Sequence, residues 1–599
     1  MIYALDERIG NPTLFCGRQQ EMSIIMNWIK RIPTKRSKSK AFLGRRKSGK
    51  TAIMERLFNI LWNQNGRIVP FYIEIQDQNK WLLHFAEEYI RTCLTQYVSF
   101  LTRTPLPPNR ENWNWQTIQE KAKDANNQSV IERIELFQEY YQVENENEAI
   151  NIAVGTPYWL YGKDNYHFVI MIDEIQYMTK YIYKDKEEKI QAYNLPGIYH
   201  GMVELRTCPM LVSGSYIGWM TQMMQDMFVG GRLKIMPVSS SLTFEEGIIA
   251  SFKYAEHNNI ALNEDLAIGI NTLAQSNPYY IASILESEWP HRDYSSLSGI
   301  VKTFANEIID KHSELHRTWI EYIYRTLNEV NDIYAKNILL VLSKERDKEF
   351  ARDEIMRAIG WPEDKESEME KKLAQLIYGD LITEGSSAYH YQGIADDVLH
   401  LIFYHKYQFE IHHQKANVYN ELHKKIELLE NDKRSMQAKI NELKGRMLEL
   451  VVWRELNAYK KAHRPIKNIR NRIRPILSNH ESFEKKISYL ENITFDRVWM
   501  NYFFNSPATM PLEIDVLATN EEKKFVLAFE TKNRNERNLP SIDECNVFLN
   551  KLDVFKQTQS QDKQIHIYGI FFSANGFSEA VEQWLHEKGI LTIDWKTWE

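Results

Sequence analysis

The chain of 599 residues has few cysteines, no long hydrophobic run and no excess of positive charge. Its four cysteines, Cys16, Cys93, Cys208 and Cys545, are far apart and form no CxxC pair. This spacing excludes a disulfide scaffold and a cysteine zinc site, and it is typical of proteins in a reduced cytosol. No run of about 18 apolar residues and no charged-then-apolar leader is present, so we expect neither a membrane span nor a secretory signal.

Lysine and arginine total 74 and aspartate and glutamate total 80, which gives a formal net charge of −6. This near balance excludes a uniformly basic nucleic-acid binder, although it leaves room for a local basic patch. With 43% hydrophobic and 12% aromatic residues, the chain is too apolar to be disordered. No repeat of 20–50 residues occurs, which disfavours a solenoid. We therefore expect a cytoplasmic protein with several folded domains.

Strand-like apolar runs alternate with amphipathic helices in the first half of the chain, which predicts a multidomain α/β protein built on a parallel sheet. The predicted strands are 41–43, 68–75, 167–172 and 210–213. Helices and then the alternating stretch LITEGSSAYHYQG indicate a winged helix-turn-helix. The predicted domains are an α/β core at 1–243 with a helical insertion at about 81–155, a small helical domain at 244–314 and a winged helix at 315–405.

A helical connector at 406–443 is predicted next, before an α/β domain at 444–599. Apolar residues follow about four heptads from Tyr419 to Met447, with a polar break at Lys433. Two interpretations stay open: a connector helix packed on its own protein, and an intermolecular coiled coil.

Residues 42–51 read FLGRRKSGKT, which is the spacing GxxxxGKT after an apolar strand and before a helix. Gly44 and Gly49 let the backbone curl, so that its N–H groups and the helix N-terminus face phosphate groups. Lys50 is expected to reach the β- and γ-phosphates of ATP, and Thr51 to hold Mg²⁺.

A second motif, HFVIMIDEIQ, is an apolar strand that ends in Asp173 and Glu174. The first carboxylate is expected to hold Mg²⁺ and the second to orient the attacking water. The next strand, CPMLVSGS, ends in Ser213 and Ser215. A serine there either senses the γ-phosphate or is an ordinary turn residue.

These motifs resemble those of the archaeal-type P-loop ATPases of the STAND group, which are relatives of AAA+ proteins. LFCGRQQEM resembles the family's GR-E motif, FYIEIQD its second strand, MIDEIQ its Walker B motif and SNPYYIASIL its lid motif. The resemblance covers about residues 10–405 and implies that Arg18 lies near the nucleotide. It also matches VGGR to a Gly-Arg after the sensor strand, so that Arg232 either acts on the γ-phosphate or forms a surface salt bridge.

Near the C-terminus, LEIDVLATNEEKKFVLAFETK predicts a hairpin of two alternating strands. Asp515 lies on the first strand, and Glu530 and Lys532 lie two residues apart on one face of the second. Carboxylates that hold one or two divalent metals, together with an ammonium group, are what phosphodiester hydrolysis requires.

This pattern resembles the PD-(D/E)XK, restriction-endonuclease-like fold. Glu449, in the helix LKGRMLELVVWREL, matches the helix-borne acid of many such nucleases, and the final strand-helix-strand pattern also fits. The proline of the PD motif is absent, since the sequence reads Glu513-Ile514-Asp515. The resemblance implies Mg²⁺ or Mn²⁺ bound by Glu449, Asp515 and Glu530; a degenerate domain that only binds DNA is the alternative.

A basic segment lies between Glu449 and Asp515 and carries no acid from Leu456 to His480. Backbone phosphates are its expected partner, and a solvated loop is the alternative. Its charged residues are Lys460, Lys461, Arg464, Lys467, Arg470, Arg472 and Arg474.

Together these motifs predict an ATP-gated, Mg²⁺-dependent nuclease that acts on DNA, with RNA not excluded, and that forms homo-oligomers. Fusions of this kind resemble prokaryotic defence effectors, for which an unidentified protein can be the trigger. The alternative function is a nucleotide-controlled DNA-binding regulator or scaffold without cleavage.

Overall fold

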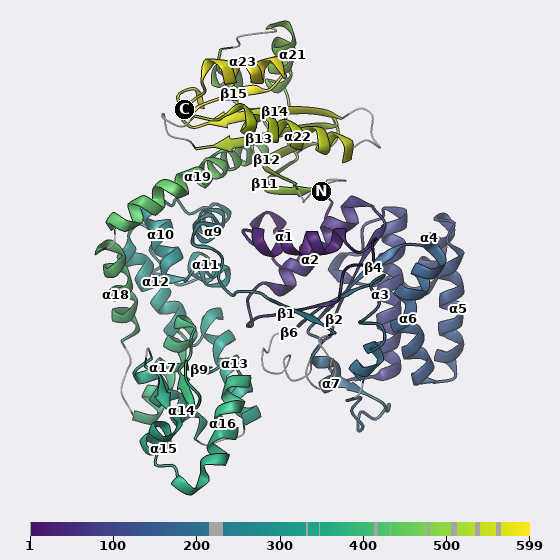
Figure 1. Cartoon of the computed structure of the whole chain (residues 1–599), viewed down its shortest axis with the longest axis vertical. Coiled ribbons are helices and arrows are strands. Elements are labelled where there is room, and N and C mark those ends of the chain that lie inside the picture. Colours follow the sequence, from purple (N-terminus) through teal and green to yellow (C-terminus); the bar gives the residue numbers. More distant parts are fainter. Residues whose placement is uncertain are drawn as a thin grey trace. The chain divides into compact units, whose positions relative to one another are not determined.

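The computed structural model describes residues 2–193, 195–214, 232–330, 334–346, 348–412, 417–431, 433–475, 480–504, 512–533, 539–558 and 565–598. The chain divides into two compact units, Met1–Ile426 and Glu427–Glu599. Figure 1 shows the helices and strands of both. Ser215, most of the VGGR motif and the side chains at 429–446, which include most of the predicted heptad, lie outside the described residues.

The first unit is built on a five-stranded sheet in the order β2-β4-β6-β1-β7, in which all neighbours are parallel. Four of its strands agree with the predicted ones to within one or two residues, and β7 was not predicted. The strands are β1 (Lys40–Leu43), β2 (Ile68–Glu74), β4 (His167–Asp173), β6 (Met210–Gly214) and β7 (Lys234–Pro237). Because the strands are parallel, all their carboxyl ends meet at one edge of the sheet and all their amino ends at the other.

Helices cover this sheet, and those between β2 and β4 occupy the predicted insertion (Figure 1). They are α1 (Gln19–Lys30), α2 (Lys50–Gln64), α3 (Leu82–Thr102), α4 (Trp115–Asp124), α5 (Gln128–Gln142), α6 (Glu146–Asp164) and α7 (Tyr177–Tyr181). Short 3-10 turns lie at Pro12–Leu14, Pro108–Arg110 and Leu195–Tyr199, and a small sheet pairs β3 (Lys80–Trp81) with β5 (Ile182–Tyr183).

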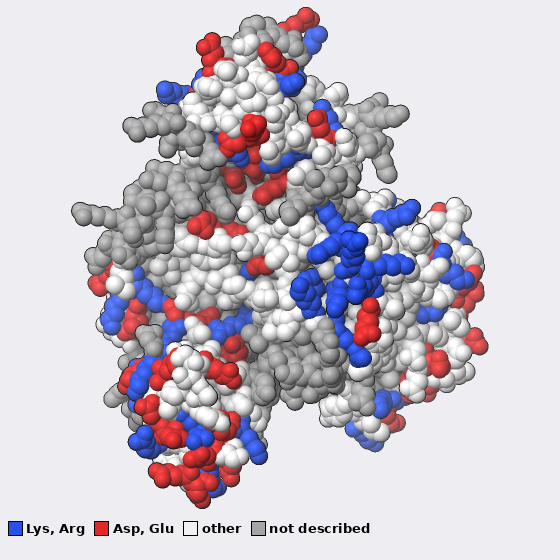
Figure 2. All heavy atoms as spheres, in the orientation of Figure 1, with Lys and Arg blue, Asp and Glu red and all other residues white. Residues whose placement is uncertain are grey.

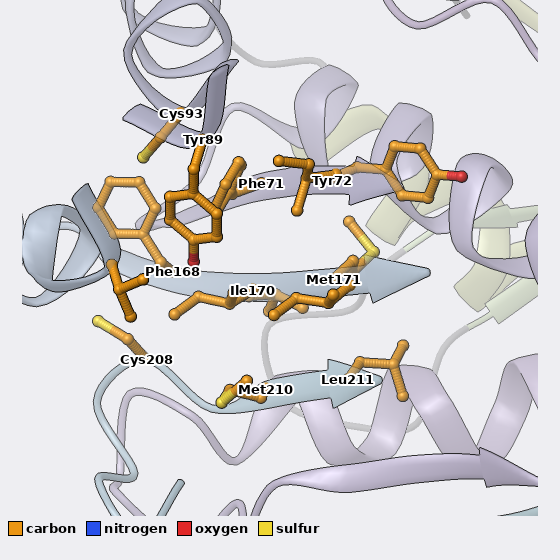
Figure 3. Close-up of a cluster of buried hydrophobic side chains, with 14 of the residues drawn as sticks. Phe71, Tyr72, Tyr89, Cys93, Phe168, Ile170, Met171, Cys208, Met210 and Leu211 are labelled. Atoms are coloured by element: carbon orange, nitrogen blue, oxygen red, sulfur yellow. The ribbon is translucent and has the colours of Figure 1, made fainter. Parts of the chain in front are cut away.

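Side chains from α3, β2, β4 and β6 form the core of this unit (Figure 3). Phe71 and Tyr89 meet edge to face with ring centroids 5.0 Å apart. Cys93 and Cys208 are both buried and free of disulfides, as their spacing in the sequence predicted. This apolar body fixes the carboxyl ends of β1, β4 and β6, where the predicted phosphate-binding residues lie.

The remainder of the first unit is mostly helical, as the pattern predicted. The helices are α9 (Phe244–His257), α10 (Glu264–Leu273), α11 (Pro278–Leu285), α12 (Leu297–Ile309), α13 (Glu314–Val330), α14 (Ala335–Lys344), α15 (Arg352–Ile359), α16 (Glu366–Tyr378), α17 (Asp397–His412) and α18 (Val418–Asn431), with a 3-10 turn at Glu363–Lys365. The predicted hairpin is present as β9 (Thr383–Glu384) and β10 (His390–Gln392), and β8 (Phe350–Ala351) joins it in a three-stranded sheet.

The second unit contains a five-stranded mixed sheet in the order β11-β12-β13-β14-β15. The strands are β11 (Arg497–Phe504), β12 (Leu512–Asn520), β13 (Phe525–Lys532), β14 (His566–Ser573) and β15 (Leu591–Ile593). The predicted hairpin is β12 and β13, and β11 is an additional antiparallel strand that the sequence analysis missed.

The long helix α19 packs on β11, β12 and β13 of this sheet. The helices of the second unit are α19 (Lys433–Lys461), α20 (Ile469–Arg472), α21 (His480–Leu490), α22 (Ile542–Thr558), α23 (Glu579–Glu587) and α24 (Trp595–Trp598). No helix in the described part of either unit is both long and apolar enough to span a lipid bilayer.

Candidate active sites

The phosphate loop connects β1 to α2, and two glycines set its path. A side chain at Gly44 would put its Cβ 2.4 Å from the Val238 carbonyl oxygen, so only glycine fits beside the end of β7. Gly49 has a φ of +82° directly before α2, a conformation that L side chains rarely adopt. The loop therefore curls as the sequence predicted, against the first residue after β7.

Lys50 begins α2, and its side chain is buried within the loop. Its ammonium donates to the carbonyl oxygens of Gly44 at 2.8 Å and Arg45 at 2.7 Å and lies 3.3 Å from Ser48 Oγ. Burial lowers the pKa of Lys50 to about 8, although Glu174 and Asp173 oppose this shift. The lysine is thus inside the loop, with its donors bound to the loop itself.

Asp173, at the end of β4, is fully buried and accepts hydrogen bonds at both carboxylate oxygens. Thr51 Oγ1 donates to Oδ2 at 2.6 Å and the Tyr72 hydroxyl at 3.2 Å, while Ser213 Oγ and the Glu174 N–H donate to Oδ1. Hydroxyl and carboxylate oxygens are the ligands that Mg²⁺ prefers. Thr51 and Asp173 therefore fit a Mg²⁺ site, and Ser213 holds the carboxylate from the neighbouring strand.

Arg18 and Glu174 lie at the same loop. Arg18 precedes α1 in a left-handed conformation, and its buried guanidinium donates to the Ser48 carbonyl oxygen and to Glu21, each at 2.9 Å. Glu174 also has a positive φ, of 53°, and Gln176 donates to its carboxylate. Both predicted residues are thus brought beside the residues of the phosphate loop.

A cleft of about 1040 Å³ opens at the phosphate loop, between the sheet and helices α11 to α13. Lys50, Thr51 and Glu174 are among the residues that line it. Leu14, Phe15, Pro278 and Tyr279 also line it, and they belong to the segments LFCGRQQEM and SNPYYIASIL of the sequence analysis. Sequence reasoning missed Ile9 and Trp289, which belong to no motif. A cleft of this size with both polar and apolar lining fits a nucleoside triphosphate.

An ion pair fastens the phosphate loop to the region after α16. Arg45 donates to Asp380 Oδ1 at 3.0 Å, and both side chains are largely shielded from solvent. Asp380 itself has a φ of 56°, in the turn between α16 and β9. No sequence motif predicted this contact, which joins residues 335 positions apart.

Arg232 does not lie at the phosphate loop. It precedes β7, at the amino edge of the sheet, whereas the phosphate loop follows β1 at the carboxyl edge. Its guanidinium lies 3.0 Å from Glu204, with side-chain exposures of 32% and 62%. The structure thus does not bring Arg232 to the phosphate loop of its own chain, and shows the surface ion pair that was the alternative.

In the second unit, Asp515 and Glu530 lie opposite each other on β12 and β13, since the register pairs Val516 with Phe529. They are 9% and 2% exposed. Asp515 Oδ2 accepts from the Thr531 N–H at 2.7 Å and from Thr531 Oγ1 at 3.2 Å, and Lys532 donates to Glu530 Oε1 at 2.8 Å. Burial and the Glu530 carboxylate raise the pKa of Asp515 to about 6.

Lys551, on α22, is a member of this group that sequence reasoning missed. Its ammonium lies 2.6 Å from Glu530 Oε2, and only 14% of its side chain is exposed. Glu449, on α19, is close enough to act electrostatically on Lys532. Two facing carboxylates fit a divalent cation, although no three His, Cys, Asp or Glu side chains among the described residues are already arranged as a metal site.

The arginines of the basic segment are engaged within their own unit. Arg474 pairs with Glu582 at 2.5 Å and with Asp594, and Arg470 pairs with Glu484 at 2.7 Å and Glu491 at 3.1 Å. Arg472 pairs with Glu455 and lies over the Trp598 ring. Acids distant in the sequence thus fold onto these three arginines, and contact of the basic segment with backbone phosphates stays a prediction.

The strand order of the first sheet places β6 between the strand of the phosphate loop and the strand of Asp173, and a phosphate loop joins β1 to α2. The fold is that of a P-loop ATPase. No family model matches the sequence, and no curated protein matches it either.

Several solved structures are similar to the chain. A Walker-type ATPase of Pyrococcus abyssi has 14% identity and a TM-score of 0.43, with 66% of this chain and 97% of that chain covered. The ORC2 protein of Aeropyrum pernix in its ADP form has 13% identity and a TM-score of 0.34, with 65% and 93% covered. The RuvB Holliday junction branch migration motor of Thermotoga maritima has 10% identity and a TM-score of 0.28, with 62% and 90% covered.

Proposed function

We propose that the first unit binds ATP with Mg²⁺ in the cleft at the phosphate loop and hydrolyses it. The observation that carries this proposal is that Lys50, Thr51 and Glu174 line a nucleotide-sized cleft, with Asp173 bonded to Thr51. Lys50 exchanges its loop carbonyls for the β- and γ-phosphates, Thr51 and Asp173 hold the metal, and Glu174 orients the attacking water. When bound, Mg²⁺ offsets the charge on the phosphoryl oxygens.

Two substitutions test this assignment. Lys50→Ala removes the ammonium and is expected to weaken nucleotide binding. Glu174→Gln is expected to leave nucleotide binding intact and to slow hydrolysis by about 10-fold or more, because it removes the carboxylate that acts as a general base. Lys123→Ala, an exposed lysine on α4, is the matched control. Wild-type hydrolysis in both site variants would reject the proposal.

The domain division follows from the same proposal. We assign the core to 1–243, the lid to 244–314, the winged helix to 315–405, the connector to 406–443 and the nuclease domain to 444–599. The three-stranded sheet β8-β10-β9 that accompanies α14 to α16 supports the winged helix, and the mixed sheet with α19 on it supports the nuclease domain.

We propose further that the second unit is a Mg²⁺-dependent nuclease, with Mn²⁺ as a substitute and DNA as its substrate. The carrying observation is that β12, β13 and α22 bring two buried carboxylates and two lysines together. Asp515, Glu530 and Glu449 are positioned to hold the metal, and Lys532 to orient the water and offset charge at the scissile phosphate. When bound, the metal polarises the phosphate and lowers the pKa of a water molecule.

A panel of DNA and RNA substrates, single- and double-stranded, with and without ATP and Mg²⁺, tests this activity. Asp515→Ala and Lys532→Met are expected to abolish cleavage and to leave ATP hydrolysis intact. Lys523→Met changes an exposed lysine of the same hairpin and is the matched control. Cleavage that persists in Lys532→Met would show that a contaminant or another site cuts.

One observation favours a second candidate function, a nucleotide-controlled DNA-binding regulator with a non-cleaving nuclease domain. Both oxygens of Glu530 are already bound by ammonium groups, those of Lys532 and Lys551. If these ion pairs persist when DNA and metal are present, the site grips phosphate without hydrolysing it. Retained DNA binding with no metal-dependent cleavage of any substrate in the panel would select this alternative.

A further inference from the structure

The amino edge of the first sheet carries a dense group of basic side chains. β1 and β7 run side by side from Lys40 and Lys234, so the segment before β1 and the start of β7 lie together. This edge is at the opposite end of the strands from the phosphate loop, and none of the functions proposed above uses it.

Six of the eleven residues from 30 to 40 are basic and none is acidic. Figure 2 shows one face of the molecule, on which Lys and Arg side chains gather over part of the first unit with few acids among them. We define the amino-edge cluster as the five exposed residues Arg31, Lys35, Arg36, Lys38 and Lys234. Lys40 is only 7% exposed and the Lys30 ammonium is buried, so neither is counted.

The backbone that presents this cluster is firmly fixed. The Arg36 N–H donates to the Arg31 carbonyl at 3.1 Å, and Trp28 Nε1 donates to the Lys38 carbonyl at 2.7 Å. The Lys234 N–H donates to the Ser39 carbonyl at 2.9 Å, which joins the loop to β7. The charges are therefore arranged on a rigid frame before any partner arrives, so binding does not have to order the loop.

The positive charges of the amino-edge cluster are not paired with acidic side chains of the described residues. Across the part of the chain that the structure describes, none of its five members forms an ion pair with a carboxylate. Burial is the largest cause that lowers the pKa of the neighbouring Lys40, and the charges of Lys234 and Arg31 lower it further. The basic segment of the second unit differs, because Arg470, Arg472 and Arg474 are paired with acids there.

We propose that the amino-edge cluster is a second nucleic-acid contact, on the ATPase unit, that binds the phosphate backbone without reading sequence. Exposed lysines and arginines on a fixed loop are the groups that neutralise backbone phosphates. This inference rests on the proposed function in one respect: the proposed nuclease activity is the reason for choosing nucleic acid, among possible polyanions, as the partner.

The test measures binding of the full chain to a labelled 30-base-pair DNA duplex in EDTA, which prevents cleavage, over a series of KCl concentrations. Lys35→Gln, Arg36→Gln and Lys38→Gln are combined in one variant. Each lost phosphate contact lowers the slope of log K against log [salt] by about 0.9, so a decrease of about 2 to 3 is expected, with affinity at least 10-fold weaker.

The matched control is Lys123→Gln, Lys184→Gln and Lys189→Gln, three exposed lysines of the same unit, with an equal change in net charge. It should bind as the wild type does. Both variants should keep the wild-type melting temperature and basal ATP hydrolysis, because the substituted side chains are exposed and outside the cleft. Equal slopes in the cluster variant and the control would overturn the proposal.

Two further outcomes are assigned in advance. If the wild type binds vesicles of phosphatidylserine and phosphatidylcholine through the same three residues and DNA does not compete, the cluster is a membrane contact and the proposal is wrong. If DNA binds through the cluster but no substrate is ever cut, the proposal holds and the nuclease function fails. Binding and cleavage are thus judged separately.

Discussion

At the scale of single residues, Asp515 and Glu530 form an arrangement that is unfavourable for the folded chain on its own. Two carboxylates face each other across neighbouring strands with little access to water, and burial together with Glu530 raises the pKa of Asp515 to about 6. The raised pKa means that ionised Asp515 opposes folding above about pH 6, a cost that disappears as the pH falls below the ordinary value of 3.8. Lys532 and Lys551 offset part of this cost through Glu530.

Asp515→Asn should therefore raise the melting temperature of the second unit in EDTA at pH 8, by a few degrees, because roughly 1 kcal/mol shifts the midpoint by about 2–4 °C in a domain of this size. Mg²⁺ should stabilise the wild type by binding to the folded state and should not stabilise the variant. Thermal unfolding with and without Mg²⁺ measures both effects. A variant less stable than wild type in EDTA would show that the Thr531 hydrogen bonds outweigh the repulsion.

At the scale of elements, the ion pairs of Arg474 are part of the framework of the second unit. This arginine joins the segment after α20 to Glu582 on α23 and to Asp594 after β15, and those acids are buried. Arg474→Ala leaves both carboxylates without a cation and should destabilise the unit by about 1–3 kcal/mol, reduced by the 25% exposure of the arginine.

Arg470→Ala is the comparison, since its partners Glu484 and Glu491 are exposed and surface pairs contribute little. Urea unfolding followed by tryptophan fluorescence should separate the two variants clearly. Equal urea midpoints for the two variants would mean that water solvates Glu582 and Asp594 as well as Arg474 does.

The contact between Arg45 and Asp380 gives the phosphate loop a restraint from outside the core. Asp380→Asn removes the charge of the partner and should let the loop move more freely, so that fluorescently labelled ADP dissociates several-fold faster in a stopped-flow experiment. Asp353→Asn, at an exposed acid on α15, is the control. Identical dissociation rates would show that the ion pair does not restrain the nucleotide site.

Local patterns predicted the elements that carry their own signals. The phosphate loop, β2, β4 and the β12–β13 hairpin follow from glycine spacing, apolar runs and alternation, which depend on neighbours in sequence. β7 and β11, Lys551, and the pairing of Arg45 with Asp380 have no such signal, because each acquires its place from residues that folding brings near. The basic segment illustrates the same limit, because its arginines are evident in the sequence but their pairing with particular acids is not.

At the scale of the whole molecule, the ATPase and carboxylate sites belong to different units, so ATP cannot act on the scissile phosphate by local chemistry within one unit. Coupling then requires two global states that the nucleotide favours unequally. On the proposed function, one nuclease site would cut one strand, so a double-strand break would require two chains. Lys50→Ala should lower double-strand cleavage although every nuclease residue is intact.

The measurement is the ratio of linear to nicked plasmid over time, with Lys123→Ala as the control. A Lys50→Ala protein that linearises plasmid as fast as wild type without nucleotide would separate the two activities. Sedimentation with and without ATP shows whether chains associate at the same nucleotide concentration.

The hydrogen bonds of Lys50 to its own loop also affect the rate of nucleotide binding. An ammonium has three donors, and here the Gly44 and Arg45 carbonyls and Ser48 are all within reach of them. A nucleotide must wait for at least one of these bonds to open, whatever its concentration. The rate of ATP binding should therefore rise with ATP concentration and then level off, and the plateau should equal the rate at which these hydrogen bonds open.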